Sequence, residues 1–175
     1  MIAIAQIGVK HGHAAGKTHT LRRNSQIDFA GIYEPDSVAR QLAQQLPVYA
    51  GIHFFQHIHD ILDDPHIQAV AIEGSNWESL AMAQYAASAG KHLWLDKPAG
   101  DDWTAFQRLI ATVTQHHRHL QLGYMFRYHH GFTLILLTAL CLPPRWHLLR
   151  PRRPPHRSDR LAPRAPHCCP GLPPQ

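Results

Sequence analysis

Short apolar segments alternate with longer segments of helical character along the first 130 or so residues of the chain. Apolar runs of about four to eight residues, bounded by Gly, Pro or Asp, are typical of buried strands. We expect strands at residues 2–8, 27–33, 68–73, 92–96 and 120–124. The segments between them predict helices at residues 14–23, 36–46, 58–62, 78–89 and 101–116.

This alternation determines the expected fold class. Strands separated by helices form right-handed β-α-β units, whose strands are parallel and whose helices cover both faces of one sheet. We therefore predict an α/β fold with a doubly wound, mostly parallel sheet of Rossmann type over residues 1–132.

The last 43 residues break the pattern. Ten of the 14 prolines lie there, together with all three cysteines, whereas Lys and Glu are absent. Proline at this density interrupts helices and strand ladders, so we expect residues 133–175 to form a disordered tail. A segment rich in Arg and Pro is also typical of a gene read out of frame or wrongly predicted, and we expect a truncated chain.

The positive charge of the chain belongs to this tail. The formal net charge is +5, but residues 1–132 hold 10 Lys and Arg against 11 Asp and Glu, and the tail holds 7 Arg against one Asp. Charge alone gives weak, salt-sensitive binding to phosphates without choice of sequence. We expect no specific nucleic-acid partner.

Two features indicate a cytoplasmic protein. Residues 1–132 contain no cysteine, and the N-terminus MIAIAQIGV lacks the basic and long apolar regions of a signal peptide. The longest strongly apolar run, residues 133–142, is about half of the length that a membrane span needs. We therefore expect no membrane partner.

The first turn is the first candidate for a binding site, because ligands of an open parallel sheet bind beyond the carboxyl ends of its strands. It reads Gly8-Val9-Lys10-His11-Gly12-His13 and precedes the first expected helix. Backbone N–H groups at a helix start can bind a pyrophosphate, and glycines permit close backbone approach. We assign Gly8, His11, Gly12 and His13 to a dinucleotide site, although Lys10 replaces the second glycine of the GxGxxG pattern.

The same region leaves a second interpretation open. Residues 12–18, GHAAGKT, resemble the phosphate-binding loop of nucleotide triphosphatases. The segment is one residue short between its glycines, and His11 stands where the first glycine would fall. A nucleotide triphosphatase therefore stays as an alternative.

Glu34 ends the second expected strand, 26 residues after Gly8. An acid at this place can accept hydrogen bonds from the adenine-ribose hydroxyls and repel a 2′-phosphate, which favours NAD over NADP as the cofactor. The alternative is that Glu34 and Asp36 merely begin the next helix.

Asp96, Lys97 and Pro98 follow at the end of the strand expected at residues 92–96. Pro98 cannot continue a strand ladder and favours an extended backbone at Lys97. Such a lysine can lie beside a nicotinamide ring and bind the oxygen of a substrate alcohol as hydride leaves. We predict Lys97 as the catalytic residue and both Asp96 and Lys97 as cofactor contacts; a lysine that is simply exposed at a strand end is the alternative.

Several of these segments together resemble one family. They are Ile7-Gly8, the acid Glu34, Gly74-Ser75-Asn76, Ala89-Gly90-Lys91-His92, Asp96-Lys97-Pro98 and Gly123-Tyr124-Met125-Phe126-Arg127-Tyr128. Over residues 2–132 the set looks like the Gfo/Idh/MocA family of glucose-fructose oxidoreductase and inositol dehydrogenase. The AGKH…DKP segment and residues 123–128 carry most of the resemblance.

The resemblance implies an NAD(P)-dependent oxidoreductase that acts on sugars or polyols by hydride transfer. It matches Lys97 to the family lysine that serves substrate and nicotinamide, and Asn76 to a loop position near the nicotinamide ribose. Asp96 and Ser79 depart from the Glu and His that are common in the family. Family members continue into a second domain that supplies the substrate pocket and most of the oligomer interface. We expect both to be missing here, which leaves a non-catalytic nucleotide-binding remnant as a further alternative.

Sixteen histidines, some in pairs such as His11 and His13, raise the question of a metal. Residues 1–132 contain no cysteine and no HExxH motif, and no histidine pair has an evident set of partner ligands in the sequence. We therefore expect no metal site.

Overall fold

Six parallel strands form the centre of the part of the chain that the computed structural model describes, residues 1–141. The strands are β1 (Ile2–Ile7), β2 (Ile27–Tyr33), β3 (Phe54–Phe55), β4 (Ile67–Ile72), β5 (His92–Leu95) and β6 (Leu120–Leu122). They lie in the order β3-β2-β1-β4-β5-β6, and each neighbouring pair is parallel. The order reverses beside β1, which confirms the predicted doubly wound Rossmann-type sheet.

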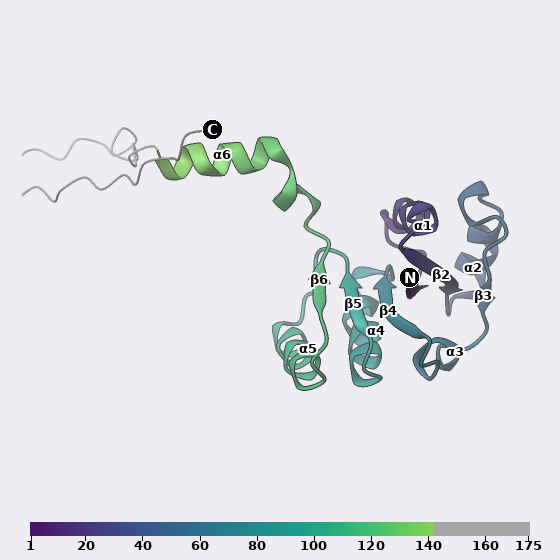
Figure 1. Cartoon of the computed structure of the whole chain (residues 1–175). Helices are drawn as coiled ribbons and strands as arrows, with labels where there is room; N and C mark the ends of the chain where they lie inside the picture. Colours follow the sequence, from purple (N-terminus) through teal and green to yellow (C-terminus); the bar gives the residue numbers. More distant parts are fainter. Residues whose placement is uncertain (142–175) are drawn as a thin grey trace, which may run out of the picture. The chain divides into compact units, whose positions relative to one another are not determined.

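Helices cover both faces of this sheet. They are α1 (Ala14–Arg23), α2 (Ser37–Gln44), α3 (His59–Leu62), α4 (Asn76–Ser88) and α5 (Trp103–Gln115), with short 3-10 helices η1 (Pro47–Tyr49) and η2 (Met125–Tyr128). Figure 1 shows α4 and α5 side by side on one face and α1 on the other. The sheet therefore has a helix layer on each side, as right-handed crossovers require.

Side chains at the helix starts explain where three of these helices begin. The Asp36 carboxylate accepts hydrogen bonds from the N–H groups of Val38 and Ala39 at the start of α2. Ser75 and Glu78 form a capping box at the start of α4, and Asp102 caps α5. Such caps satisfy N–H groups that have no partner inside the helix.

The core lies between the sheet and its helices. The central strands are mostly apolar, and Ile7, Val70 and Leu95 are fully buried. Alanines of α4 allow this helix to approach the sheet closely, and Leu109 of α5 packs beside them. This pattern is typical of parallel strands that are covered on both faces.

Helix α6 (His130–Cys141) differs from the expected disordered tail. It crosses the boundary that the sequence placed at residue 132 and belongs to a second unit that begins at His129. Residues 133–142 contain no proline and are rich in Leu, which favours helix, whereas the dense prolines begin at Pro143. The rest of the predicted tail, residues 142–175, lies outside the described residues.

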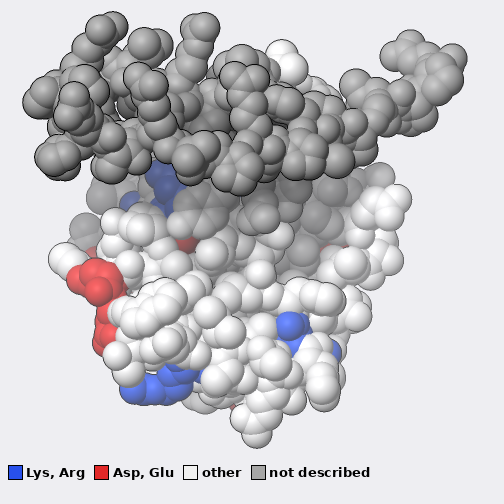
Figure 2. Space-filling model, turned by 90° about the vertical axis from the view of Figure 1, so that its left-hand side faces the viewer, with Lys and Arg blue, Asp and Glu red and all other residues white. Residues whose placement is uncertain are grey.

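At 12 residues, α6 is too short to cross a membrane, and no other helix within residues 1–141 is long and apolar enough to do so. The described residues on the face shown in Figure 2 carry small groups of charged side chains, with no extended basic patch.

Lys91, from the AGKH segment, is a buried structural lysine. Its ammonium donates hydrogen bonds to the backbone oxygens of Asp64 (2.6 Å) and Ile67 (2.8 Å), and burial lowers its pKa. It thus ties the start of β5 to the loop that enters β4. Lys91→Met keeps the apolar stem but leaves two carbonyl groups without their donor.

We expect Lys91→Met to lower the free energy of unfolding by about 1–3 kcal/mol, the usual cost of removing a buried hydrogen-bond partner. Urea unfolding followed by circular dichroism measures the change. Lys97→Met is the matched control because Lys97 is exposed, and it should leave the urea midpoint unchanged. Equal midpoints for the Lys91 variant and the parent would contradict the structural role.

Candidate functional site

The carboxyl ends of four neighbouring strands meet at one edge of the sheet. β1 ends beside β2 and β4, and β4 ends beside β5. The residues that follow these strands are Gly8, Glu34, Glu73 and Asp96. A turn between β1 and α1 adds His11, Gly12 and His13, so most of the predicted site residues lie at this edge.

Gly8 allows the turn to pass against the end of β4. Its φ is +93°, and a Cβ placed there would contact the backbone nitrogen of Gly74 and lie 2.6 Å from the carbonyl carbon of Glu73. The Gly8 N–H donates to the Tyr33 oxygen at 2.7 Å. Glycine is therefore required at this position.

The rest of the turn leaves room for a ligand. A Cβ at Gly12 would meet no atom within 4 Å. The N–H of His11 is bonded to the Glu73 oxygen, whereas the N–H groups of Lys10 and Gly12 have no acceptor among residues 1–141. Two unpaired donors beside open space at a helix start can receive an anion such as a pyrophosphate.

Glu34 fixes this turn to the end of β2. It is only 1 % exposed, and its two carboxylate oxygens accept hydrogen bonds from the N–H groups of Val9 (2.8 Å) and Asp36 (2.9 Å). The cap of α2 is Asp36, so Glu34 does not itself begin that helix. Its predicted contact with the adenine ribose stays a prediction.

A buried ion cluster lies behind the turn. Lys17 of α1 forms an ion pair with Glu73, and its ammonium lies 3.2 Å from Asp96 Oδ2 and 4.3 Å from the centre of the Trp94 ring. The side chains of Lys17, Glu73 and Asp96 are 4 %, 0 % and 6 % exposed. Buried charges of this kind are stable only when they are paired.

The cluster bears on the triphosphatase alternative. A phosphate-binding loop needs its lysine to reach the phosphates and its hydroxyl to reach a metal. Here Lys17 is bound to buried carboxylates, and the hydroxyl of Thr18 donates to Gln6 at 2.8 Å. Both side chains point into the domain, so the structure does not favour this alternative.

In the sequence, Lys17 was a candidate only as the lysine of the phosphate-loop alternative, and not as part of a buried ion cluster. The sequence does carry a signal for the burial of Lys17. The helical spacing of Ala14, Lys17, Thr18 and Leu21 places this lysine on the buried face of α1. A lysine at such a position needs acidic partners, but the spacing alone does not say which ones.

The two carboxylates of the cluster titrate differently. Burial raises the pKa of Glu73, although the nearby charge of Lys17 opposes this effect. Burial also acts to raise the pKa of Asp96, but the Lys97 N–H, which donates to Oδ1 at 2.7 Å, and the charge of Lys17 outweigh it, and the pKa is lowered. Asp96 is thus a fixed negative charge at the end of β5.

His11 and His13 connect the turn to these acids. His13 Nδ1 lies 3.1 Å from Asp96 Oδ2, and His11 Nδ1 lies 3.4 Å from Glu73 Oε2 and 3.7 Å from Asp96 Oδ2. The two rings meet edge to face, with centres 4.9 Å apart. The structure therefore brings three predicted site residues together: His11, His13 and Asp96.

Lys10 bridges the outer side of the same edge. Its ammonium lies 3.3 Å from Asp36 and 3.2 Å from Glu78, which belong to the starts of α2 and α4. These side chains are between about a quarter and two fifths exposed, so the pairs are largely solvated. In the sequence, Lys10 stands out only as the residue that replaces the second glycine of the GxGxxG pattern.

Lys97 and Asn76 stand apart from the cluster. Both are exposed, at the end of β5 and at the first residue of α4. The peptide bond between Lys97 and Pro98 is cis. The Lys97 side chain forms no hydrogen bond or ion pair with the described residues, and its predicted catalytic role stays a prediction.

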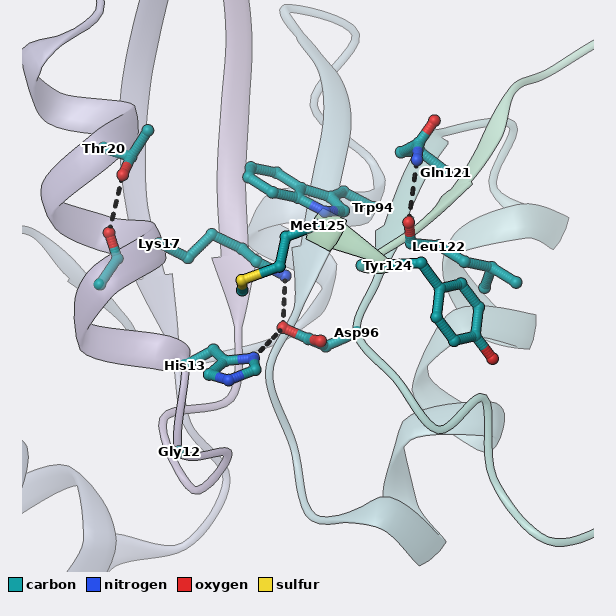
Figure 3. Close-up of a pocket in the computed structure, with 12 residues that line it drawn as sticks. Gly12, His13, Lys17, Thr20, Trp94, Asp96, Gln121, Leu122, Tyr124 and Met125 are labelled. Carbon is teal, nitrogen blue, oxygen red and sulfur yellow. Dashed lines mark hydrogen bonds and ion pairs between the residues drawn. The ribbon is translucent and has the colours of Figure 1, made fainter. Parts of the chain in front are cut away.

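A cavity of about 530 Å³ opens beside the cluster, between α1 and the strands β5 and β6 (Figure 3). Its walls include His13 and Lys17 on one side and Trp94, Tyr124 and Met125 on the other. Gly123 contacts Asp96 closely, since a Cβ there would lie 2.5 Å from Oδ1. This contact explains the glycine that opens the 123–128 segment.

Comparison with known proteins agrees with this geometry. The family described as "Oxidoreductase family, NAD-binding Rossmann fold" (Gfo/Idh/MocA) matches residues 2–124. No sequence among curated proteins matches the chain.

Solved structures share the fold at low sequence identity. GenD2 from gentamicin A biosynthesis, in complex with NAD, is 18 % identical with a TM-score of 0.67, over 79 % of this chain and 38 % of that protein. UDP-N-acetylglucosamine 3-dehydrogenase GnnA from Acidithiobacillus ferrooxidans is 21 % identical with a TM-score of 0.64, over 81 % and 43 %. Biliverdin reductase from Synechocystis sp., in complex with biliverdin and NADP⁺, is 18 % identical with a TM-score of 0.60, over 69 % and 37 %.

The chain thus spans about two fifths of the length of these structures. Identities at this level establish the fold alone, whereas the family match covers residues 2–124 and includes the turn, Glu34 and the Asp96-Lys97-Pro98 segment. The resemblance seen in the sequence is confirmed: this chain belongs to the Gfo/Idh/MocA oxidoreductase family and has its NAD-binding Rossmann fold.

Proposed function

We propose that residues 1–128 bind a nicotinamide dinucleotide at the carboxyl edge of the sheet, with its pyrophosphate on the turn between β1 and α1. One observation carries this proposal: the N–H groups of Lys10 and Gly12 lack acceptors within residues 1–141, beside open space at Gly12. Gly8 and Glu34 hold the turn in this shape. His11 and His13 are placed to line the same space.

We favour NAD over NADP because an acid ends β2. Glu34 is 1 % exposed and accepts two backbone hydrogen bonds, so it contributes to the cofactor choice through the negative charge that it holds at the end of β2. Asp36 adds a second negative charge at this end, which repels a 2′-phosphate. The structural relatives include an NAD complex and an NADP⁺ complex, so the cofactor choice has to be measured on this chain.

The proposed reaction is hydride transfer between the cofactor and a sugar or polyol. A nicotinamide bound there would take the hydride from the carbon of a substrate alcohol, and the hydroxyl proton would pass to water. Lys97 is proposed to hold the alcohol oxygen, because its ammonium is exposed and has no partner within the described residues to compete for it. Asn76 and Asp96 are the proposed contacts on the nicotinamide side.

The substrate class rests on the family and on similar proteins. One structural relative is a UDP-N-acetylglucosamine 3-dehydrogenase, and another acts in gentamicin A biosynthesis. The substrate class, the turnover and the oligomer contacts of the whole protein are proposed from these similarities. A purely nucleotide-binding role would show cofactor binding without oxidation of any sugar or polyol.

Isothermal titration with NAD, NADP and ATP tests the binding proposal. We expect micromolar binding of NAD, weaker binding of NADP and none of ATP. Gly12→Val should weaken NAD binding at least about tenfold, which corresponds to about 1.4 kcal/mol, because it fills the open space on the turn. Its stability in urea should stay that of the parent, since a Cβ at this position meets no atom within 4 Å.

Gly16→Ala is the matched control. Gly16 lies four residues after Gly12, in the first turn of α1, where a Cβ also meets nothing within 4 Å. It should bind NAD as the parent does. Binding of ATP alone, or equal NAD affinity in the Gly12 variant, would overturn the proposal.

A further inference from the structure

His11, His13 and Asp96 place three metal-ligating atoms around one point. Each of the three side chains offers one ligand atom, and these atoms all lie within 4.8 Å of one another. The Nδ1 atoms of His13 and His11 lie 3.1 and 3.7 Å from Asp96 Oδ2. Ligands held at about 2.1 Å from a metal lie about 3.0–3.5 Å apart in octahedral or tetrahedral geometry. The separations from Oδ2 are thus close to those of a coordination shell.

We propose that His11, His13 and Asp96 bind a divalent transition-metal ion such as Zn²⁺ or Co²⁺. Two imidazoles and one carboxylate form a set that these ions prefer, and three protein ligands leave open positions for water or a ligand oxygen. This proposal departs from the sequence-based expectation of no metal site. The third ligand was hidden because Asp96 lies 83 residues after His13.

The carboxylate is held in place for this role. The Lys97 N–H donates to Asp96 Oδ1 at 2.7 Å and leaves Oδ2 toward the histidines. Hydrogen bonds of this kind orient a ligating carboxylate and raise metal affinity. On the turn, the His13 N–H donates to His11 Nδ1 at 3.2 Å, and a metal ion would replace that weak bond.

Nearby charges both favour and oppose the binding of a cation at this site. Two buried carboxylates, Glu73 and Asp96, face one buried ammonium, Lys17, so a cation offsets the surplus negative charge. The Lys17 ammonium lies 3.2 Å from the ligand atom Oδ2 and repels a metal ion. We therefore expect micromolar rather than tighter affinity.

The proposal does not depend on dinucleotide binding. Its test uses the full chain, freed of metal with a chelator and titrated with Co²⁺ alone. We expect one ion per chain at micromolar affinity, with visible absorption bands of Co²⁺ bound to nitrogen and oxygen. Zn²⁺ should displace the Co²⁺ and abolish the bands.

Variants identify the site among the many histidines. His11→Ala/His13→Ala should weaken Co²⁺ binding at least about thirtyfold, or about 2 kcal/mol. His57→Ala/His59→Ala is the matched control, with the same spacing at two exposed positions, and should bind as the parent does. Asp96→Asn should also remove the bands, and urea unfolding checks that each variant is folded.

Two results would overturn the metal site. One is the absence of Co²⁺ binding by the folded parent chain. The other is equal affinity in the parent and in a folded His11/His13 variant, which would assign the ion to other histidines. A chain that binds Co²⁺ but no dinucleotide would contradict the proposed function and leave this inference standing.

Discussion

Gly8→Ala is expected to destabilise the domain by about 4 kcal/mol or more, at the upper end of what single substitutions cost. A residue with a side chain at φ +93° loses about 1–3 kcal/mol from backbone strain alone. The new Cβ also collides with the backbone of Glu73 and Gly74, which cannot move without separating β4 from β1. Urea unfolding should show a much lower midpoint, or no folded state at all.

Gly12→Ala is the control for this prediction, because it shows whether any alanine in the turn destabilises the domain. It lies four residues away, in open space, and should change the free energy of unfolding by less than about 0.5 kcal/mol. If the two variants unfold at the same urea concentration, the close approach at Gly8 does not limit the fold.

Lys17→Met should have the second-largest effect. It removes the ammonium but keeps most of the apolar stem, and leaves Glu73 and Asp96 as two buried carboxylates without their cation. Loss of one partner from a buried ion pair typically costs about 3–5 kcal/mol. The same urea titration measures it.

Lys10→Met is a sharp control because Lys10 also pairs with two carboxylates, those of Asp36 and Glu78, but at the solvated edge. Exposed pairs contribute about 0–1 kcal/mol, so its midpoint should barely move. A second check is Lys17→Met/Glu73→Gln, which removes a charge of each sign and should recover part of the loss. Equal effects at Lys10 and Lys17 would show that burial does not set the strength of these pairs.

The hydrophobic pattern was sufficient for most of the fold. The bounds expected for α1 and β2, residues 14–23 and 27–33, are those observed, because each segment has a clear period and a polar boundary. β3 was missed, since two residues carry no period. Helix α6 was assigned to a disordered tail because the prolines after residue 142 dominated the composition of the whole segment.

Only part of the candidate site could be predicted from the sequence. Strand ends and turn glycines pointed to Gly8, Glu34 and Asp96, because the topology places such residues at one edge. The pairing of Lys17 with Glu73 joins residues 56 positions apart in the chain, and no local pattern encodes it. The exposed positions of Asn76 and Lys97 likewise follow from the fold and not from their motifs.

The pairing of β1 with β4 has a consequence for how the chain folds. Ala3 lies opposite Ile67, so β1 pairs on this side with a strand more than 60 residues downstream in the sequence. Such non-local pairing closes a long loop before it gains contacts, which slows folding. A ribosome must therefore release β4 before the sheet can close around β1, and β5 before Asp96 can meet the histidines. We therefore expect the site to form late in folding, because its residues come from segments that lie far apart in the sequence.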